Sequence, residues 1–449
     1  MTLLDGQSEV DSVEVKISGL NLEIKTWDDY SIREDFLTPT AAFDFVLSTN
    51  DPTKYNNIFV EGAEIQISVN GRPQLTGTIE KVDLADDRKS GLAYRISGRD
   101  ILGPVVSASI DTKVRITSNQ YVSDFLSLVL SPFGISKVSV GDENNYSVVT
   151  GFLKGQGGRT TSTVQVKEAA SRTSSDGKAT IVYNTKNVTQ VVSRNRPDLK
   201  KIPLDQLKPK IGDGAMQVIN RLLSRLGLAM WAAADGSGVI VDSPDWDTAP
   251  IHRLVRHFDD PRNNVIEGRK SINAEVQPSC LIAVGQSSGS DMAKIKLKAV
   301  AVNELVAVNP DGTLAKHVQD TIANYPGIKV LPLRKQLIPS TNRIVSRRKP
   351  IPMFLKDEES KSIDQIAAFV RRKLSEKQKQ YQTMTYVVTG HAYNGHPWAI
   401  NTNVEVDDDY LGVHETMWVM SRVFKKSRGA GTITELQLIK PFTLALGED

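Results

Sequence analysis

Apolar and polar residues alternate along much of the first hundred residues, which is the pattern of half-buried β-strands. From Val13 to about Val106, the segments "VEVKI", "LNLEIK", "AAFDFVLS", "AEIQISV", "LTGTIEKVDL" and "LAYRIS" are separated by Gly, Asp, Asn and Pro. Their spacing predicts a small antiparallel β-barrel or sandwich over residues 12–105. Within "LTGTIEKVDL" the apolar face changes phase between Ile79 and Val82, which predicts a β-bulge.

The segment "SVNGRPQLTGTI" (residues 68–79) predicts a β-hairpin inside this unit. Asn70 and Gly71 stand where both central residues of a type I′ turn need positive φ. No residue of the hairpin has an obvious catalytic role, so its place is architectural.

Two amphipathic helices and a short strand predict a mixed α/β domain over residues 106–265. In the first helix Ser118 is the expected N-cap, and the apolar face consists of Val122, Phe125, Leu126 and Val129. In the second helix Asp213 is the expected cap, and the apolar stripe consists of Ala215, Ile219, Leu222, Leu223 and Leu226. Pro132 and Gly227 are expected to end the two helices.

Residues 153–208 interrupt this domain with a stretch rich in Ser, Thr, Gly and Lys. The stretch carries 11 Lys and Arg against 4 Asp and Glu, so its local charge exceeds that of the whole chain. It is interpreted as an inserted basic arm, either a solvated loop or a β-hairpin. The alternative is an arm that docks on an acidic partner or on nucleic acid.

The C-terminal half predicts a second barrel around a helical segment. Residues 266–310 return to β patterning and, together with four strands in residues 384–443, predict a discontinuous second β-barrel. Residues 311–383 predict an irregular basic connection and an amphipathic helix with a Ser362–Gln365 capping box. Its apolar stripe is Ile363, Ile366, Val370 and Leu374, and "RRKLSEKQKQ" is expected to be solvated. The fold class is therefore α+β, mainly antiparallel β, with two small barrels of similar type.

Composition narrows the possible functions. The 449 residues carry a net charge of +3, too balanced for a nucleic-acid binder recognised by bulk charge. The single cysteine, Cys280, excludes an internal disulfide and is expected to be buried. No stretch approaches the ~18 apolar residues of a membrane span, and "MTLLDGQSEVDS" does not resemble a signal peptide. These features predict a chain made in the cytoplasm that does not span a membrane.

The sequence contains no strong motif for catalysis, nucleotide binding or metal binding. The Gly-rich "GQGGRTTS" (155–162) lacks the Lys-Ser/Thr pair of a phosphate loop. His391 and His396 could bind a metal with Asp407, Asp408 and Asp409, but their spacing fits turn residues better. No nucleophile elbow and no arranged pair of carboxylates is evident. We expect no enzyme activity, no catalytic residue, no cofactor and no metal.

Residues 61–109 carry the hairpin turn, then Thr76-Gly77, then a strand that ends in Gly98-Arg99-Asp100. Later in the chain come "PFGI", the helix and strand after Asp213, "GRKSINAEVQPSCLIAVGQ", and residues 362–441, which include Pro397-Trp398. Together these segments resemble the Mu-type baseplate hub of contractile phage tails, the late control D family. The 153–208 stretch exceeds the family pattern, so the resemblance implies nothing about its role.

The resemblance implies a structural tail hub of the virion baseplate. In this family two tail-tube-like barrels per chain assemble as a homotrimer, so that six modules surround one axis. Such a ring would join the six-fold tail tube to a three-fold central spike, contact other baseplate (wedge) proteins, and pass DNA without reading its sequence. No glycine-rich needle follows the second barrel, which implies a separate spike protein.

Two other functions stay open at this point: a cell-wall-degrading tail enzyme, and the hub of a type VI secretion or phage-tail-like bacteriocin particle. For Gly98-Arg99-Asp100 a capped turn is favoured over an inter-subunit ion pair. Trp398 and Trp418 are expected to pack in the core or at an interface.

Overall fold

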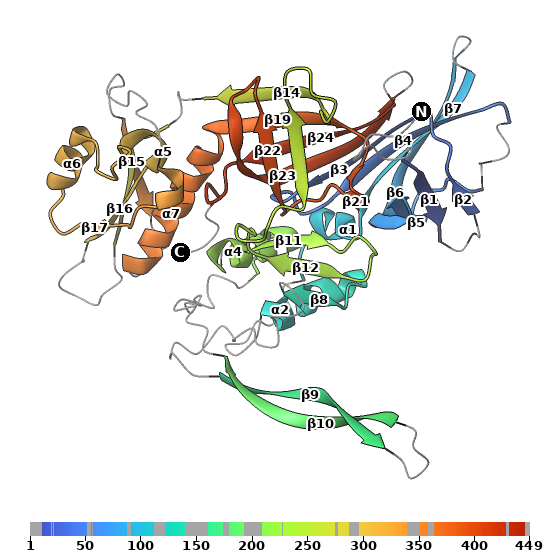
Figure 1. Cartoon of the computed structure of the whole chain (residues 1–449), viewed down its shortest axis with the longest axis horizontal. Helices are drawn as coiled ribbons and strands as arrows, with labels where there is room; N and C mark the ends of the chain where they lie inside the picture. The colour runs from blue at the N-terminus through green and yellow to red at the C-terminus, as the bar shows by residue number, and fades with distance from the viewer. Residues whose placement is uncertain are drawn as a thin grey trace.

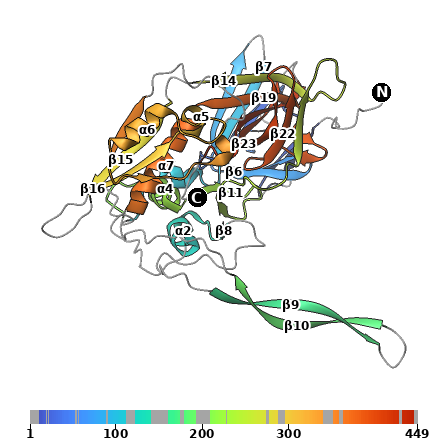
Figure 2. The same cartoon turned by 60° about the vertical axis from the view of Figure 1, so that its left-hand side comes forward.

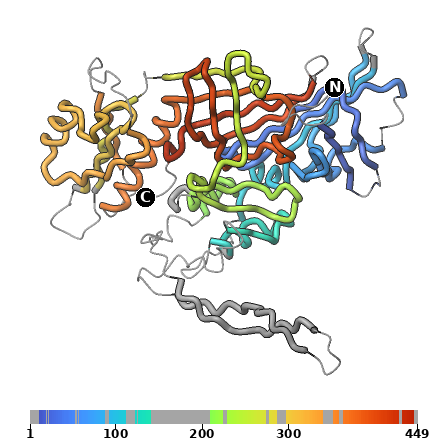
Figure 3. The backbone as a smooth tube through the Cα atoms, viewed as in Figure 1, coloured from blue at the N-terminus to red at the C-terminus, as the bar shows by residue number. Residues whose placement is uncertain are grey.

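The protein is described by a computed structural model (Figures 1 and 3). The structure describes residues 11–18, 20, 22–51, 55, 57–87, 91–111, 122–140, 160–173, 179–192, 209–226, 228–273, 277–286, 296–338, 351–357, 363–427 and 431–444. The fold is α+β and mainly antiparallel β, which confirms the fold class expected from the sequence.

A 13-stranded sheet forms the centre of the molecule (Figure 1). Its N-terminal strands are β1 (Val13–Ile17), β2 (Leu22–Ile24), β3 (Asp29–Asp35), β4 (Ala42–Thr49), β5 (Glu64–Val69), β6 (Arg72–Asp87) and β7 (Gly91–Asp100). Its C-terminal strands are β13 (His252–Arg256), β14 (Val265–Ile272), β19 (Gln382–Thr389), β22 (Asn403–Asp408), β23 (Val413–Ser427) and β24 (Gly431–Ile439). Between β19 and β22, β20 (Ala392–Tyr393) pairs with β21 (His396–Pro397).

Strand β23 joins the two halves of this sheet. Its first part, Val413–Trp418, pairs with β22, and its second part, Ser421–Lys426, pairs with β3. On its other edge it pairs with β24. The N-terminal and C-terminal strands are therefore hydrogen-bonded into one sheet, and their inward side chains belong to a single hydrophobic core.

The hairpin and the bulge expected near the N-terminus are both confirmed. Asn70 and Gly71 have φ values of 51° and 75°, and Val69 pairs with Arg72 across the turn. The register between β6 and β7 shifts between Ile79 and Lys81, where the apolar face of the sequence changes phase.

A mixed α/β layer lies below the large sheet in Figure 1. It contains α1 (Gly103–Ser107), α2 (Val122–Leu130), η1 (Ser131–Phe133), α4 (Ala215–Leu226) and a three-stranded sheet of β8 (Val138–Val140), β11 (Ala229–Ala232) and β12 (Val239–Asp242). The predicted helix faces are buried at Val122, Phe125, Leu126, Val129, Ala215, Ile219, Leu222 and Leu223. The expected cap Ser118 lies outside the described residues. Within the basic stretch, β9 (Thr160–Thr173) and β10 (Ala179–Val192) pair as an antiparallel hairpin.

A second α/β unit corrects the expected boundaries of the C-terminal barrel. Strands β15 (Cys280–Gln286), β16 (Lys296–Val302), β17 (Lys329–Val330) and β18 (Pro352–Asp357) form a separate four-stranded sheet. Helix α7 (Ile363–Lys379) covers one face, and α5 (Glu304–Ala307), α6 (Lys316–Ala323) and η2 (Lys335–Leu337) complete the unit, as Figure 2 shows from a second side. Among the described residues of the range 266–310, those of β14 belong to the large sheet, and β15 and β16 belong to the four-stranded sheet.

The physical reason lies in the composition of β15 and β16. Residues 280–283 and 299–302 are apolar at every position and almost completely buried, so both faces of these strands are covered. Continuous apolar runs are typical of strands that have layers on both sides, whereas barrel strands with one wet face alternate. Strand β13 was expected in the mixed α/β domain of residues 106–265. It belongs instead to the large sheet, where it pairs in parallel with β22.

Candidate functional site

The two histidines considered as a metal pair lie in different surroundings. His391 is fully buried, with Nε2 2.7 Å from the Tyr30 hydroxyl and Nδ1 3.1 Å from the Thr434 hydroxyl. Burial lowers the pKa of His391 to about 4, so the ring is neutral near pH 7. His396 lies in β21, and its carbonyl oxygen is 3.2 Å from Nε2 of His252. His391 therefore connects β3 to β24.

Asp11 connects the Asn70 turn to the same region. Its carboxylate accepts hydrogen bonds from the backbone N–H of His391 at 2.7 Å, the Thr432 hydroxyl at 3.1 Å and the Asn70 side-chain amide at 2.8 Å. The hairpin turn near the N-terminus is thus bonded to the C-terminal half of the sheet.

The Arg99-Asp100 pair has the structural role that the sequence favoured. The Asp100 carboxylate accepts from the backbone N–H groups of Ala41 at 2.7 Å and Leu102 at 2.9 Å. Burial raises the pKa of Asp100 to about 7. Arg99 forms an ion pair with Glu80 of the same chain at 2.8 Å. The capped turn is confirmed.

Trp398 and Trp418 both lie in the core. They are 1% and 0% exposed, so neither ring is available to a partner. Trp398 stacks on His252 with ring centroids 4.5 Å apart, and Trp418 contacts Phe36 at 5.0 Å and Trp246 at 4.9 Å.

A buried ion network corrects the expectation that the polar face of α7 is solvated. Glu304 is fully buried and forms ion pairs with Arg334 and Arg371, each at 3.1 Å. Gln378 donates to Glu304 at 2.8 Å, and Arg334 donates to the Phe442 carbonyl at 3.0 Å. Arg371 and Gln378 of "RRKLSEKQKQ" are buried because they balance and bond this carboxylate.

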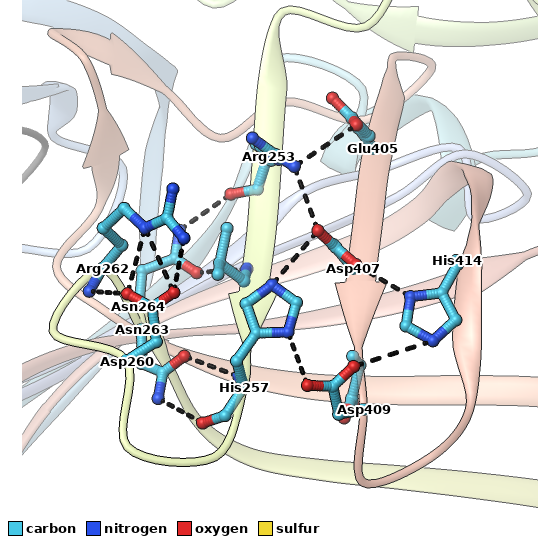
Figure 4. A network of polar contacts seen from close by, with 12 residues as sticks. Arg253, His257, Asp260, Arg262, Asn263, Asn264, Glu405, Asp407, Asp409 and His414 are labelled. Carbon is cyan, nitrogen blue, oxygen red and sulfur yellow. Dashed lines mark hydrogen bonds and ion pairs between the residues drawn. The ribbon is translucent and has the colours of Figure 1, made fainter.

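A cluster of partly exposed ionisable groups lies where β13 and β22 end (Figure 4). Nδ1 of His257 is 2.8 Å from Asp409, and its Nε2 is 3.2 Å from Asp407. Nδ1 of His414 is 2.8 Å from Asp407, and its Nε2 is 3.8 Å from Asp409. Two imidazoles and two carboxylates thus alternate in a closed cycle, which we call the His–Asp ring.

Further charges surround the His–Asp ring. Arg253 in β13 lies 3.0 Å from Asp407 and 3.6 Å from Glu405, and Arg262 pairs with Asp260 at 2.6 Å in the loop after β13. The contact with Asp409 raises the pKa of His257, and the hydrogen bond from His414 lowers the pKa of Asp407. The ring therefore favours the charged form of the His257 imidazole and the charged form of the Asp407 carboxylate.

Sequence reasoning singled out Asp407 and Asp409 but paired them with the wrong histidines. Their partners are His257 and His414. His257 comes next to Asp407 because β13 pairs in parallel with β22, with Val255 opposite Asp407. Nothing local signals a parallel pairing between segments so far apart in sequence. In the part of the chain that the structure describes, no group of three or more His, Cys, Asp or Glu side chains could hold a metal ion.

Two further expectations concern Cys280 and membrane association. Cys280 is buried as expected, and burial raises the pKa of its thiol to about 11, so it is not an activated nucleophile. Among the described helices, none is long and apolar enough to cross a membrane.

Comparisons with known proteins agree with the resemblance seen in the sequence. Residues 12–100 match the family model described as Mu phage baseplate assembly protein GpP-like, N-terminal. This match confirms the resemblance to Mu-type baseplate proteins. No curated relative matches the chain.

Two solved tail proteins share the fold along almost the whole chain. The tail protein from Neisseria meningitidis has a TM-score of 0.64 and 19% identity, over 98% of this chain and 100% of that one. The 43 kDa tail protein of prophage MuSo2 from Shewanella oneidensis has a TM-score of 0.63 and 16% identity, over 96% and 99%. At these identities the likeness concerns the fold.

Proposed function

We propose that the chain is a structural protein of a phage-type tail baseplate and acts there as the hub. The match of residues 12–100 to the Mu-type baseplate model carries the proposal. The full-length similarity in fold to two tail proteins supports it. A structural role also fits the buried hydrogen bonding of His391, Asp100 and Glu304, which stabilises the fold.

The hub assembles as a homotrimer that adapts one symmetry to another. Each chain contributes an N-terminal and a C-terminal β unit joined through β23 and β3. Three chains then supply six β units around an axis, which matches a six-fold tail tube on one side and a three-fold central spike on the other. DNA passes through the lumen of this ring during ejection without sequence-specific contacts. The near-balanced net charge of +3 suits such a passage.

Its partners are the spike protein, the tail tube protein and the surrounding wedge proteins of the baseplate. The chain is made in the host cytoplasm and is incorporated into the virion tail. No catalysis is part of this role.

The test is the solution mass of the purified chain, measured by light scattering alone and after mixing with the spike protein encoded nearby. We expect a mass of three chains, or a complex of three hub and three spike chains. A stable monomer under both conditions would overturn the symmetry-adapter proposal.

A further inference from the structure

His257 has a hydrogen-bond geometry that only its protonated form can satisfy. Its Nδ1 faces Asp409 at 2.8 Å and its Nε2 faces Asp407 at 3.2 Å. Ionised carboxylates only accept hydrogen bonds, and a neutral imidazole has one N–H to donate. Both contacts therefore exist as hydrogen bonds only when both ring nitrogens carry a proton.

The ring joins two segments of chain, the loop after β13 and the β22–β23 turn, and each has hydrogen bonds of its own. In the loop after β13, the Asn263 side chain bonds the backbone N–H and carbonyl of His257, at 2.7 and 2.8 Å. In the turn between β22 and β23, the Asp408 carboxylate accepts from the backbone N–H groups of Tyr410 at 2.9 Å and Leu411 at 3.1 Å. Asparagine does not titrate, so these bonds within the loop do not respond to a change of pH near neutrality.

An exposed aromatic pair lies directly beside the ring. Phe258 follows His257 and is 65% exposed, and Tyr410 follows Asp409 and is 51% exposed. Their ring centroids are 4.3 Å apart, and the Arg256 guanidinium lies 4.6 Å from the Tyr410 centroid. The position of Phe258 on Tyr410 thus depends on how the loop is held to the turn.

We propose that the His–Asp ring is a proton-operated clasp: protonated His257 holds residues 257–264 against the β22–β23 turn, and loss of its proton loosens that attachment. The clasp fixes the Phe258–Tyr410 pair at the surface. It is a property of the folded chain and does not rest on the proposed hub function.

The charges around His257 set the direction of the response. On β13 they are Arg253 and Arg256, in the loop Asp260 and Arg262, on β22 Glu405, Asp407 and Asp408, in the turn Asp409, and on β23 His414. Arg253 binds Asp407 at every pH near neutrality and competes with His257 for that carboxylate. Asp409 faces the two imidazoles, so its attachment is the one that the proton governs.

The sign of the pH dependence follows from these contacts. The pKa of His257 is raised above its ordinary value of 6.5, so the clasp is closed below that value and opens as the pH rises through the higher pKa of the folded chain. The carboxylate Asp407 has a lowered pKa and stays ionised through this range.

The experiment is hydrogen exchange of the full chain at about pH 6 and about pH 9, corrected for intrinsic exchange rates. We expect the hydrogen-bonded amides of Arg262, Asn263 and Asp409 to lose protection about tenfold more than the rest of the sheet between the two conditions. In His257→Gln the loop should be weakly protected at both values. In the matched control His396→Gln, whose histidine lies outside the ring, the wild-type response should persist.

Asp409→Asn provides a second variant that keeps a hydrogen-bond acceptor but removes the charge. It should move the midpoint of the wild-type response to lower pH, since a neutral partner favours the imidazolium less. Equal loop protection at both pH values in the wild type, or a wild-type response in His257→Gln, would overturn the clasp.

Discussion

Charged side chains inside this protein are stabilised by one another. Glu304 lies between Arg334 and Arg371 with no exposed surface of its own. Removing one partner of such a group costs more than the pair contributes, because the remaining charges stay buried without compensation. Loss of this buried carboxylate should therefore destabilise the second α/β unit strongly.

Glu304→Ala should lower the free energy of unfolding by about 3–5 kcal/mol, because it leaves two buried guanidinium groups without their carboxylate. Glu376→Ala is the matched control: Glu376 is half exposed and pairs with Lys373 at the surface, at 2.9 Å. Its loss should cost less than about 1 kcal/mol. Urea unfolding of the two variants checks the difference, and equal losses would contradict the role given to the network.

Two buried titratable groups should act in opposite directions as the pH falls from neutrality. His391 has a folded pKa of about 4, below its ordinary 6.5, so the unfolded chain binds its proton first and acid lowers stability. Asp100 has a folded pKa of about 7, above its ordinary 3.8, so the folded chain binds its proton first and acid raises stability. At about 1.4 kcal/mol per pKa unit, each effect amounts to roughly 3–4 kcal/mol and the two largely cancel.

Single variants should separate these effects. In Asp100→Asn, stability should fall more steeply than in the wild type between about pH 7 and pH 4, because only the His391 effect is left. In His391→Gln it should rise over the same range. Unfolding curves in urea at several pH values measure both slopes, and parallel slopes in all three proteins would refute the assignment.

At the scale of elements, the local sequence pattern was sufficient to predict a helix or strand where one face of that element is exposed to solvent. The alternation around Ile65 and Ile67, the turn at Asn70-Gly71 and the stripe of α7 all predicted elements that the structure contains. Pairing partners could not be predicted in this way. The parallel β13–β22 and β15–β18 contacts join segments far apart in sequence, and no local residue pattern encodes which distant strand will be adjacent.

The polar contacts were harder to predict than the elements. Arg371 and Gln378 look like solvent-facing residues of an amphipathic helix, yet they are buried because Glu304 approaches from another element. His257 looked unremarkable until the β13–β22 pairing brought it next to Asp407. In each case the missing information was the position of a distant residue.

The basic stretch of residues 153–208 can be tested as an element that binds a partner. We propose that residues 153–208, with 11 basic against 4 acidic residues, dock on a neighbouring baseplate protein. All the core residues that the structure describes in the α/β layer and in the large sheet come from outside this stretch. Replacing residues 153–208 with a short Gly/Ser linker should therefore leave the thermal midpoint within about 2 °C of wild type, while tails assembled with this chain lose the neighbour.

Mass spectrometry of purified tails and an infectivity assay measure the second effect. Replacing the basic residues of the stretch by Ser, without shortening it, is the matched control for length. Tails of unchanged composition and infectivity after the deletion would refute the docking role.

At the scale of the whole molecule, the two β units behave as one body because they share a sheet and a core. Strand β3 pairs with β23 across residues Asp35 to Tyr30, and Tyr30 also bonds His391. Arg422, which is buried, reinforces the junction through an ion pair with Glu34 at 2.7 Å. Neither unit can be removed without exposing strand edges and apolar surface of the other.

A fragment of residues 12–105 should therefore not fold stably, although its sequence reads as a complete barrel. Separation from β23 leaves the edge of β3 unpaired and exposes core side chains such as Tyr30 and Phe45 to water. We expect the fragment to aggregate or to show no cooperative thermal transition, whereas both halves of the sheet in the full chain unfold in one transition. Calorimetry of the fragment and of the full chain measures this difference. A fragment with a sharp transition of its own would mean that the two β units are independent domains. The shared sheet would then not be what holds them together as one body.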